Sequence, residues 1–285
     1  NNYGGLGQNN KTQYSSPVQI PGVWRTVWAT GYTMYGTKPD GTLWAWGRNN
    51  SAQLGLGDKT DYSSPKLVGA HADNWASVTA QREQCYGVRY DGSLWAWGRN
   101  TYGMDLQGAG GLTHDLGKAY SPVPVIGSGF NDYDWSTEES EFARSDYGGM
   151  WMKNDGSMWS WGDGQYGSLG IQNSNMQISS PTQIPGMWKG GILAADSAVS
   201  AATKPDGTLW MWGRNYSGSL GQNSRVDYSS AVQVPGTDWF RPLVQGTSTK
   251  CVKGDGTLWV WGNNNNGCLG LNQPEGTNYS SPVQV

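Results

Sequence analysis

The sequence predicts an all-β fold, and three observations support this prediction. An Asp-Gly pair recurs about every fifty residues, a short run with two tryptophans follows each pair, and a Ser-Ser-Pro-type segment follows each run. A period near fifty residues is the size of one four-stranded β-propeller blade. We therefore predict a β-propeller of four-stranded blades, with five full repeats of about 50 residues and an N-terminal half repeat.

The Asp-Gly pairs predict a tight turn in the middle of each repeat. Their aspartates are Asp40, Asp91, Asp155, Asp206 and Asp255, so the steps between repeats are 51, 64, 51 and 49 residues. Asp-Gly between two extended runs indicates a two-residue hairpin, because a type I′ turn requires positive φ at both central residues.

The tryptophan runs predict the strand that follows each turn. In Leu43-Trp44-Ala45-Trp46 the two indoles lie two residues apart, so both project from one face of a strand. We expect these pairs to form the structural core of the repeats: Trp44, Trp46, Trp95, Trp97, Trp159, Trp161, Trp210, Trp212, Trp259 and Trp261. A third column of indoles precedes each turn, at Trp24, Trp75, Trp135, Trp188 and Trp239.

Two further elements complete each repeat. A Gly-x-Leu-Gly element, degraded in the second full repeat, surrounds Leu6, Leu54, Leu169, Leu220 and Leu269. A Tyr-Ser-Ser-Pro-Val-Gln segment begins at Tyr14 and recurs from Tyr62, Tyr120, Ile178, Tyr228 and Tyr279, with Ala231 in place of one proline. Proline lacks the N–H that a central strand needs, so this segment is predicted to be the outer strand.

The repeats divide the chain as one propeller domain over 1–285. The half repeat covers 1–22, and the full repeats cover 23–68, 69–126, 127–186, 187–236 and 237–285. We expect six blades, with the half repeat completed by a partner strand or by further sequence.

The combined pattern resembles the regulator of chromosome condensation repeat family. The residues that carry the resemblance are Asp40-Gly41-Thr42-Leu43-Trp44-Ala45-Trp46-Gly47, then Asn50-Ser51-Ala52-Gln53-Leu54-Gly55 and Pro65-Lys66-Leu67-Val68. The resemblance implies a propeller, usually of seven blades, and a protein-binding role. The near-identical units and Asn-rich turns are similar in style to bacterial or phage-encoded members.

Composition limits the partners. The chain has 19 basic and 22 acidic residues, which is too balanced for a phosphate-backbone binder, so we expect no nucleic-acid partner. No apolar run approaches a membrane span, so we expect no membrane insertion. The low charged content favours an extracellular or virion-surface location. Three cysteines without ligand spacing predict no metal site, and we expect no cofactor.

Candidate binding residues lie where the repeat is irregular, because insertions in repeat proteins map to functional loops. Residues 101–120 and 131–141 lengthen neighbouring repeats and combine aromatic with acidic side chains. The candidates are Tyr102, Asp105, His114, Asp115, Asp132, Tyr133, Asp134, Glu138 and Glu139. A recurring cation two residues before each turn aspartate is interpreted as a solvated strand end, with an anion-attracting ring as the alternative.

The two histidines, His71 and His114, lie in different repeats and provide no catalytic triad, so we predict that the chain is not an enzyme. The favoured function is a structural or binding propeller that presents loops to a protein or glycan. We expect it to serve as a decoration, fibre or adhesin module on a virion or cell surface. The alternative is a soluble protein-binding regulator, either an enzyme inhibitor or a GTPase exchange factor-like protein.

Overall fold

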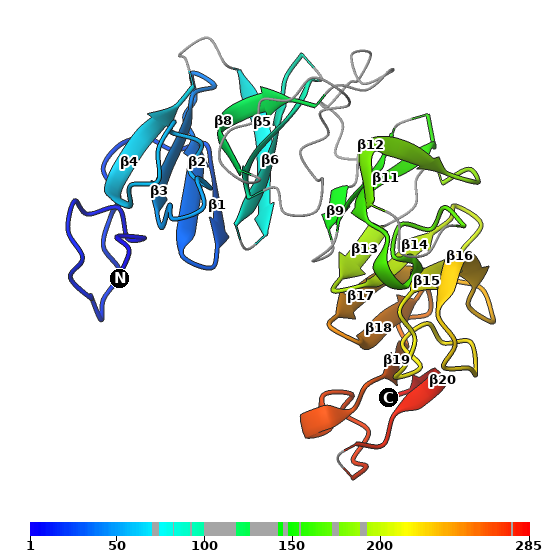
Figure 1. The fold of residues 1–285 in the computed structure, drawn as a ribbon. Coiled ribbons are helices and arrows are strands. Elements are labelled where there is room, and N and C mark those ends of the chain that lie inside the picture. The colour runs from blue at the N-terminus through cyan, green and yellow to red at the C-terminus, as the bar shows by residue number, and fades with distance from the viewer. Residues whose placement is uncertain are drawn as a thin grey trace. The chain divides into compact units, whose positions relative to one another are not determined.

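The computed structural model contains five four-stranded antiparallel sheets, in agreement with the predicted all-β fold (Figure 1). It describes residues 1–69, 74–81, 83–91, 93–99, 118–125, 142–144, 148–153, 155–172, 177–188, 193–274 and 276–285. The chain divides into two compact units, Asn1–Thr137 and Glu138–Val285. No described helix is long and apolar enough to cross a membrane.

Each sheet contains four consecutive strands in sequence order, which is the arrangement of a propeller blade. In the N-terminal unit, blade 1 contains β1 (Thr26–Thr30), β2 (Thr33–Thr37), β3 (Leu43–Gly47) and β4 (Tyr62–Val68). Blade 2 contains β5 (Trp75–Gln81), β6 (Gln84–Arg89), β7 (Leu94–Arg99) and β8 (Lys118–Pro124).

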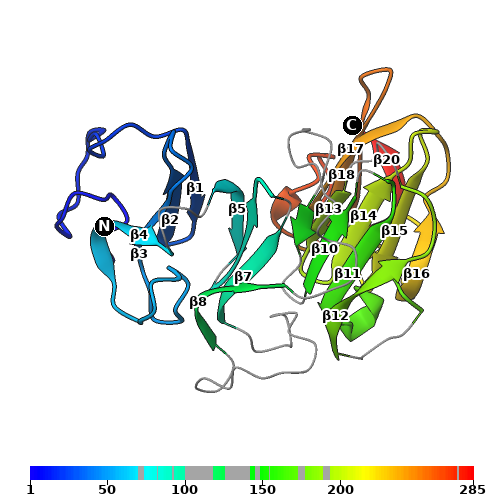
Figure 2. The same ribbon diagram turned by 90° about the horizontal axis from the view of Figure 1, so that it is seen from above.

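The C-terminal unit contains three blades of the same kind, in which the third strand always lies between the second and the outer strand. Figure 2 shows this order in blades 3 and 4. Blade 3 contains β9 (Phe142–Arg144), β10 (Gly148–Met152), β11 (Met158–Asp163) and β12 (Gln177–Ile184). Blade 4 contains β13 (Leu193–Asp196), β14 (Val199–Thr203), β15 (Leu209–Gly213) and β16 (Tyr228–Gln233). Blade 5 contains β17 (Trp239–Gln245), β18 (Ser248–Lys253), β19 (Leu258–Gly262) and β20 (Tyr279–Gln284). Two short 3-10 turns, η1 (Gln165–Gly167) and η2 (Asn265–Gly267), follow the third strands of blades 3 and 5.

The Asp-Gly pairs lie between the second and third strands, as predicted, but the turn type is different. In blade 1 the N–H of Gly41 donates to Lys38 O (2.9 Å) and the N–H of Lys38 donates to Thr42 O (3.0 Å). Gly41 has a φ of +80°, whereas Asp40 is not among the residues with positive φ. The prediction of a two-residue type I′ turn was therefore wrong, and the loop is a longer turn with one left-handed glycine.

The outer strands contain the predicted proline segment and a bulge. In blade 1, Ala45 pairs with Lys66 but Gly47 pairs with Tyr62, so the outer strand has two extra residues there. The same register shift occurs in the other four blades. Pro65 lies within this bulge, where a residue without an N–H costs no ladder hydrogen bond.

Packing between consecutive blades supplies the hydrophobic core. In the N-terminal unit, Tyr35 and Leu54 from blade 1 pack with Trp75 and Trp97 from blade 2. In the C-terminal unit, Leu220 from blade 4 packs with Trp239 and Trp261 from blade 5. The loop after the third strand of blades 1 and 4 is thus an interblade element, because its leucine is buried in one cluster with tryptophans of the next blade.

The half repeat contains the same loop but no strand. The indole N–H of Trp46 donates to Gly5 O (2.9 Å), and the N–H of Asn9 donates to Ser63 O (2.7 Å). Residues 1–10 therefore contact blade 1 as the loops after the third strands of blades 1, 3 and 4 contact their next blades.

Candidate functional site

The predicted loop site lies outside the described residues, and its residues stay predictions. These residues are Tyr102, Asp105, His114, Asp115, Asp132, Tyr133, Asp134, Glu138 and Glu139. His71 also lies outside the described part of the chain. Within the described part, no group of three or more His, Cys, Asp or Glu residues is placed to hold a metal ion.

The ten paired tryptophans occupy two different environments. The second member of each pair is fully buried: Trp46, Trp97, Trp161, Trp212 and Trp261. The first member is half-buried: Trp44, Trp95, Trp159, Trp210 and Trp259. Indoles from the third column pack against both members, and Trp188, for example, lies 6.2 Å from Trp210 and 6.0 Å from Trp212 between ring centroids.

The buried indoles join successive blades by hydrogen bonds. The N–H of Trp212 donates to Ser168 O (3.0 Å) in the preceding blade, and the N–H of Trp261 donates to Ser219 O (2.7 Å). Trp97 donates to Gln53 O (2.8 Å) in the same way. These tryptophans are interblade contacts and leave no free polar atom for a ligand.

The half-buried indoles belong to a hydrogen-bonded turn that recurs in all five blades. In blade 4, Asp206 Oδ1 accepts the Thr208 N–H (3.0 Å) and the Thr208 hydroxyl (2.6 Å), and Thr208 Oγ1 accepts the indole N–H of Trp210 (2.9 Å). The Thr208 side-chain bond, followed by its backbone bond, holds the pKa of Asp206 below its usual value. The other blades repeat the bond between indole and hydroxyl.

The recurring cation before each turn lies over an indole. Lys204 Nζ is 4.0 Å from the Trp210 ring centroid and 4.8 Å from that of Trp188. The same stacking occurs at Lys38, Arg89, Lys153 and Lys253. Cation–π contacts of this kind stabilise the turn, so the structure favours a packing role over the solvated strand end and over an anion-attracting ring.

A second rim, at the opposite end of the third strands, carries exposed Arg–Tyr clusters. In the C-terminal unit the Arg214 guanidinium lies 4.5 Å from the Tyr166 ring centroid and 4.4 Å from that of Tyr216. Tyr216 is 50% exposed. Hydrogen bonding to Thr247 and Ser217, with a smaller effect of Arg214, lowers the pKa of the Tyr216 phenol. This cluster joins residues from three consecutive blades.

The N-terminal unit has an equivalent cluster. The Arg48 guanidinium lies 5.1 Å from the Tyr3 ring centroid and 6.0 Å from that of Tyr32, and the two tyrosine rings are 5.0 Å apart. Tyr32 is 61% exposed. In each unit, we call the surface formed by its own Arg–Tyr cluster and the neighbouring strand-end loops the loop rim of that unit.

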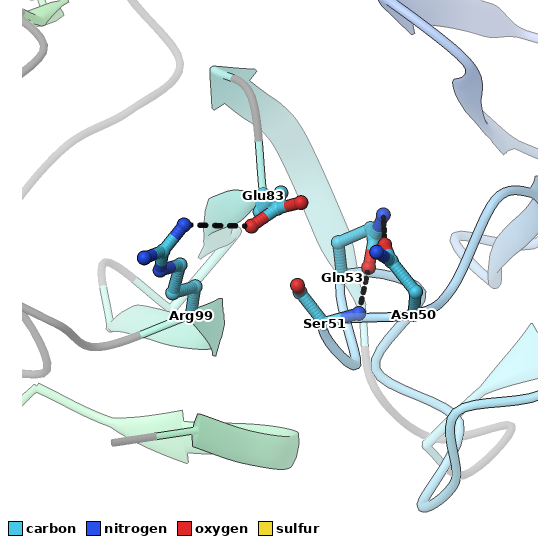
Figure 3. A network of polar contacts seen from close by, with 5 residues as sticks. All are labelled: Asn50, Ser51, Gln53, Glu83 and Arg99. Atoms are coloured by element: carbon cyan, nitrogen blue, oxygen red, sulfur yellow. Dashed lines mark hydrogen bonds and ion pairs between the residues drawn. The ribbon is translucent and has the colours of Figure 1, made fainter. Parts of the chain in front are cut away.

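The loop rim continues into blade 2, where it is polar (Figure 3). Arg99 Nη1 lies 3.1 Å from Glu83 Oε2. Beside this pair, Gln53 Oε1 accepts the Ser51 N–H (2.8 Å), which fixes the loop between β3 and β4. The side chain of Arg99 is 53% exposed and that of Glu83 is 23% exposed, so solvent screening leaves this ion pair only a small contribution to stability.

Sequence reasoning missed the loop rim. Its arginines follow the Trp-Gly of the third strand at Arg48, Arg99 and Arg214. Tyr166 and Tyr216 lie in the loops after third strands, Tyr3 lies in the matching segment of the half repeat, and Tyr32 lies between β1 and β2. That spacing was visible in the sequence, but the pairing of Arg214 with Tyr166 joins residues 48 positions apart, and only the fold brings them together.

Comparison with known proteins gives matches to one repeat family. Residues 40–80, 155–193 and 255–285 match the regulator of chromosome condensation (RCC1) repeat.

The ultraviolet-B receptor UVR8 of Arabidopsis thaliana is 27% identical over 66% of this chain and 40% of that protein. The E3 ubiquitin-protein ligase HERC2 of Homo sapiens is 25% identical over 68% of this chain and 4% of that protein. The chain therefore spans less than half the length of these curated relatives.

Two solved structures share the fold. Human WBSCR16 has a TM-score of 0.70 at 17% identity, over 91% of this chain and 66% of that one. Yeast RCC1 (Prp20), solved with Kap60, has a TM-score of 0.66 at 17% identity, over 91% of this chain and 63% of that one. The chain is thus an array of four-stranded β-propeller blades, three segments of which match the RCC1 repeat.

Proposed function

We propose that the chain is a non-enzymatic propeller that binds a protein partner through the loop rims of its two units. The observation that carries this proposal is the pair of exposed Arg–Tyr clusters around Arg48 and Arg214. Arginine and tyrosine are enriched among the residues that dominate binding energy at protein interfaces. The stacked guanidinium groups are held in place by the rings, so a partner pays little ordering entropy to contact them.

The solved structures that share the fold support a protein partner. Yeast RCC1 was solved bound to Kap60, and a further structure of Prp20p from Saccharomyces cerevisiae describes binding to Gsp1p and histones, with a TM-score of 0.51. These partners belong to those proteins. What we transfer to this chain is the class of activity, which is recognition of a protein surface by a propeller.

The described titratable groups support a non-catalytic role. Hydrogen bonds within the turns lower the pKa values of Asp206 and Asp255, and burial raises the pKa of the Cys251 thiol to about 12. Each shift has a structural cause, and none places an activated nucleophile beside a base.

For the setting of this activity we propose display on the outside of a virion or cell, as a decoration, fibre or adhesin module that contacts protein or glycan. The support is compositional: Asn, Ser, Thr and Gly supply a large share of the sequence, and only 14% of residues are charged. A soluble regulator is the second candidate, and the structure of yeast RCC1 with Kap60 favours it.

The test is a comparison of two double variants of the purified chain. Arg214→Ala with Tyr216→Ala removes one cluster, and Arg225→Ala with Val226→Ala removes a matched charge and an exposed apolar side chain from the loop between β15 and β16. Quantitative affinity purification from the source cells is followed by mass spectrometry, and a glycan array is probed in parallel.

We expect the cluster variant alone to lose its partner. Capture of one stoichiometric soluble protein would favour the regulator, and capture of surface proteins or glycans would favour display. A partner bound equally by the wild type and both variants would refute the loop rim as the binding surface.

A further inference from the structure

The arginine after the third strand has the same backbone setting in blades 2 and 4. In blade 2 the N–H of Arg99 donates to Glu83 O (2.8 Å), and Arg99 Nη1 lies 3.1 Å from Glu83 Oε2 (Figure 3). In blade 4 the N–H of Arg214 donates to Ala198 O (2.9 Å). Glu83 and Ala198 each directly precede the second strand of their blade. The hairpin of blade 4 therefore has a methyl group where that of blade 2 has a carboxylate.

The donors of the Arg214 side chain find no acceptor within the described part of the chain. Its guanidinium carbon is 4.5 Å from the Tyr166 ring centroid and 4.4 Å from that of Tyr216. These cation–π contacts use the charge of the group and none of its N–H bonds. No described oxygen lies within hydrogen-bond or ion-pair distance of its nitrogen atoms. A half-buried guanidinium is thus held by two rings with its N–H groups unused.

The carboxylates of the adjoining hairpin and loop bind backbone N–H groups instead of this arginine. Asp196 Oδ1 accepts the Ser197 N–H (2.6 Å), and Asp196 Oδ2 accepts the Gly246 N–H of blade 5 (2.7 Å). Asp227 Oδ1 accepts the Asn215 N–H (2.6 Å). Both carboxylates therefore fix the loops around the guanidinium and leave its charge unpaired.

The surroundings of the guanidinium favour negative charge. Tyr216 is 50% exposed, and hydrogen bonds to Thr247 and Ser217, together with the charge of Arg214, hold the pKa of its phenol below the ordinary value. The same hydroxyl groups and the same cation would stabilise any anion that approaches this exposed side of the cluster.

We propose that the Arg214 cluster is a carboxylate-binding site, to which the protein partner supplies an aspartate or glutamate side chain. The carboxylate takes the place beside Arg214 that Glu83 takes beside Arg99, and an N–H of the guanidinium donates to it. This inference rests on the proposed function, because it names the chemistry of the partner at the loop rim of the C-terminal unit.

The charge of the cluster fits a carboxylate better than a phosphate group. The described cluster contains one cation, which contacts two neutral rings. A phosphate group carries a charge near −2 and is typically recognised by a cluster of arginines. A single carboxylate matches the single charge of Arg214.

The test is an NMR titration of the isotope-labelled chain that follows the side-chain Nε–H signal of Arg214, identified by its loss in Arg214→Gln. The probes are the peptide N-acetyl-Gly-Glu-Gly-amide, the same peptide with glutamine in place of glutamate, and inorganic phosphate, all at constant ionic strength. We expect the glutamate peptide to shift the signal saturably and to bind at least about tenfold more tightly than the glutamine peptide, because a hydrogen bond between two ions is stronger than one to a neutral amide.

Two variants of Ala198 test the comparison with blade 2. Ala198→Glu places a carboxylate where Glu83 lies in blade 2, so it should abolish the response to the glutamate peptide. Ala198→Gln is the matched control and should keep the response. Because Ala198 is only 1% exposed, both variants can fail to fold, and Arg214→Gln then decides. Followed through the backbone amides of residues 214–217, Arg214→Gln should show no preference for the glutamate peptide.

Arg225 is the control within the wild-type chain. It is an exposed arginine on the loop between β15 and β16. Its signal should respond equally to the glutamate and glutamine peptides, because a solvated guanidinium gains little from an exposed ion pair.

Three results would overturn the proposal. They are equal binding of the two peptides at Arg214, a glutamate preference that persists in Arg214→Gln, and tighter binding of phosphate than of the glutamate peptide. The last result would assign the cluster to phosphate groups. Any of these results, with partner capture that still depends on Arg214 and Tyr216, would leave the proposed function standing. A glutamate preference without such a partner would remove the proposed function and keep the carboxylate site.

Discussion

Substitution of Trp212 by alanine tests whether the second tryptophan of each pair joins neighbouring blades. Trp212 is fully buried, and its indole N–H donates to Ser168 O in blade 3. Replacing a buried tryptophan by alanine costs about 3–5 kcal/mol. About 1 kcal/mol of this is the hydrogen bond, and Ser168 O keeps a second donor in the Ser200 hydroxyl (3.2 Å).

Trp210→Ala is the matched control, because Trp210 lies two residues away on the same strand and is only half-buried. Half of a tryptophan's buried area at about 25 cal/mol per Å² gives about 2–3 kcal/mol as an upper bound. We therefore expect a smaller loss of unfolding free energy for Trp210→Ala, measured by guanidinium denaturation with circular dichroism.

Hydrogen exchange separates the two variants more sharply. Trp212→Ala should accelerate exchange in residues 163–172 of blade 3, which lie far from it in sequence, because that loop loses its contact with the indole. The indole of Trp210 bonds within its own turn, so Trp210→Ala should leave exchange at residues 163–172 unchanged. Equal acceleration in both variants, or none in Trp212→Ala, would refute the assignment of interblade roles.

Three further predictions concern a glycine, a turn and the thiols. Gly170→Ala should cost at least about 1 kcal/mol in thermal unfolding, because Gly170 has a φ of +70° and an added Cβ would lie 2.8 Å from a buried indole nitrogen. Thr208→Val should raise the pKa of Asp206 toward its ordinary value in a carbon-detected NMR titration, since the hydroxyl donor is lost. In native protein at pH 8, Cys268 should react with a thiol reagent while Cys251 does not, because Cys268 is exposed and burial raises the pKa of Cys251 to about 12.

The controls follow from the same geometry. Gly270→Ala shares the φ of +70° but has open space around the added Cβ, so a loss equal to that of Gly170→Ala would contradict the steric argument. Thr208→Ser keeps the hydroxyl and should keep the low pKa. Because Asp206 has a lowered pKa in the folded state, its stabilisation is present above the unfolded value of about 3.9 and is lost as the pH falls below it. A wild-type stability that does not decrease below pH 4 would contradict this sign.

The regular part of the fold was predictable because each repeat contains local sequence signals for its own strands. The spacing of Trp44 and Trp46 indicated a strand with one aromatic face, and Pro65 indicated the outer strand. The turn type was mispredicted because a dipeptide rule ignores side-chain bonding: the Asp40 carboxylate accepts the Thr42 N–H and hydroxyl, which holds a longer loop closed.

The loop rim was not predictable from local sequence. Arg214 meets Tyr166 only because the loop of one blade contacts the next blade. The packing of the recurring cations also depends on tertiary structure, because Lys204 contacts both Trp210 and Trp188, which are 22 residues apart in the sequence. Sequence patterns report neighbours along a strand, whereas both features depend on contacts between strands and between blades.

The bonds from Trp97, Trp212 and Trp261 to a carbonyl of the preceding loop give the array a direction. Trp261 donates to the loop of blade 4 and Trp212 donates to the loop of blade 3, so each of these junctions joins a donor surface to a different acceptor surface. A head-to-tail contact of this kind does not limit the number of units. Duplication or loss of one whole repeat during evolution would therefore preserve the chemistry of every remaining junction and change only how many there are.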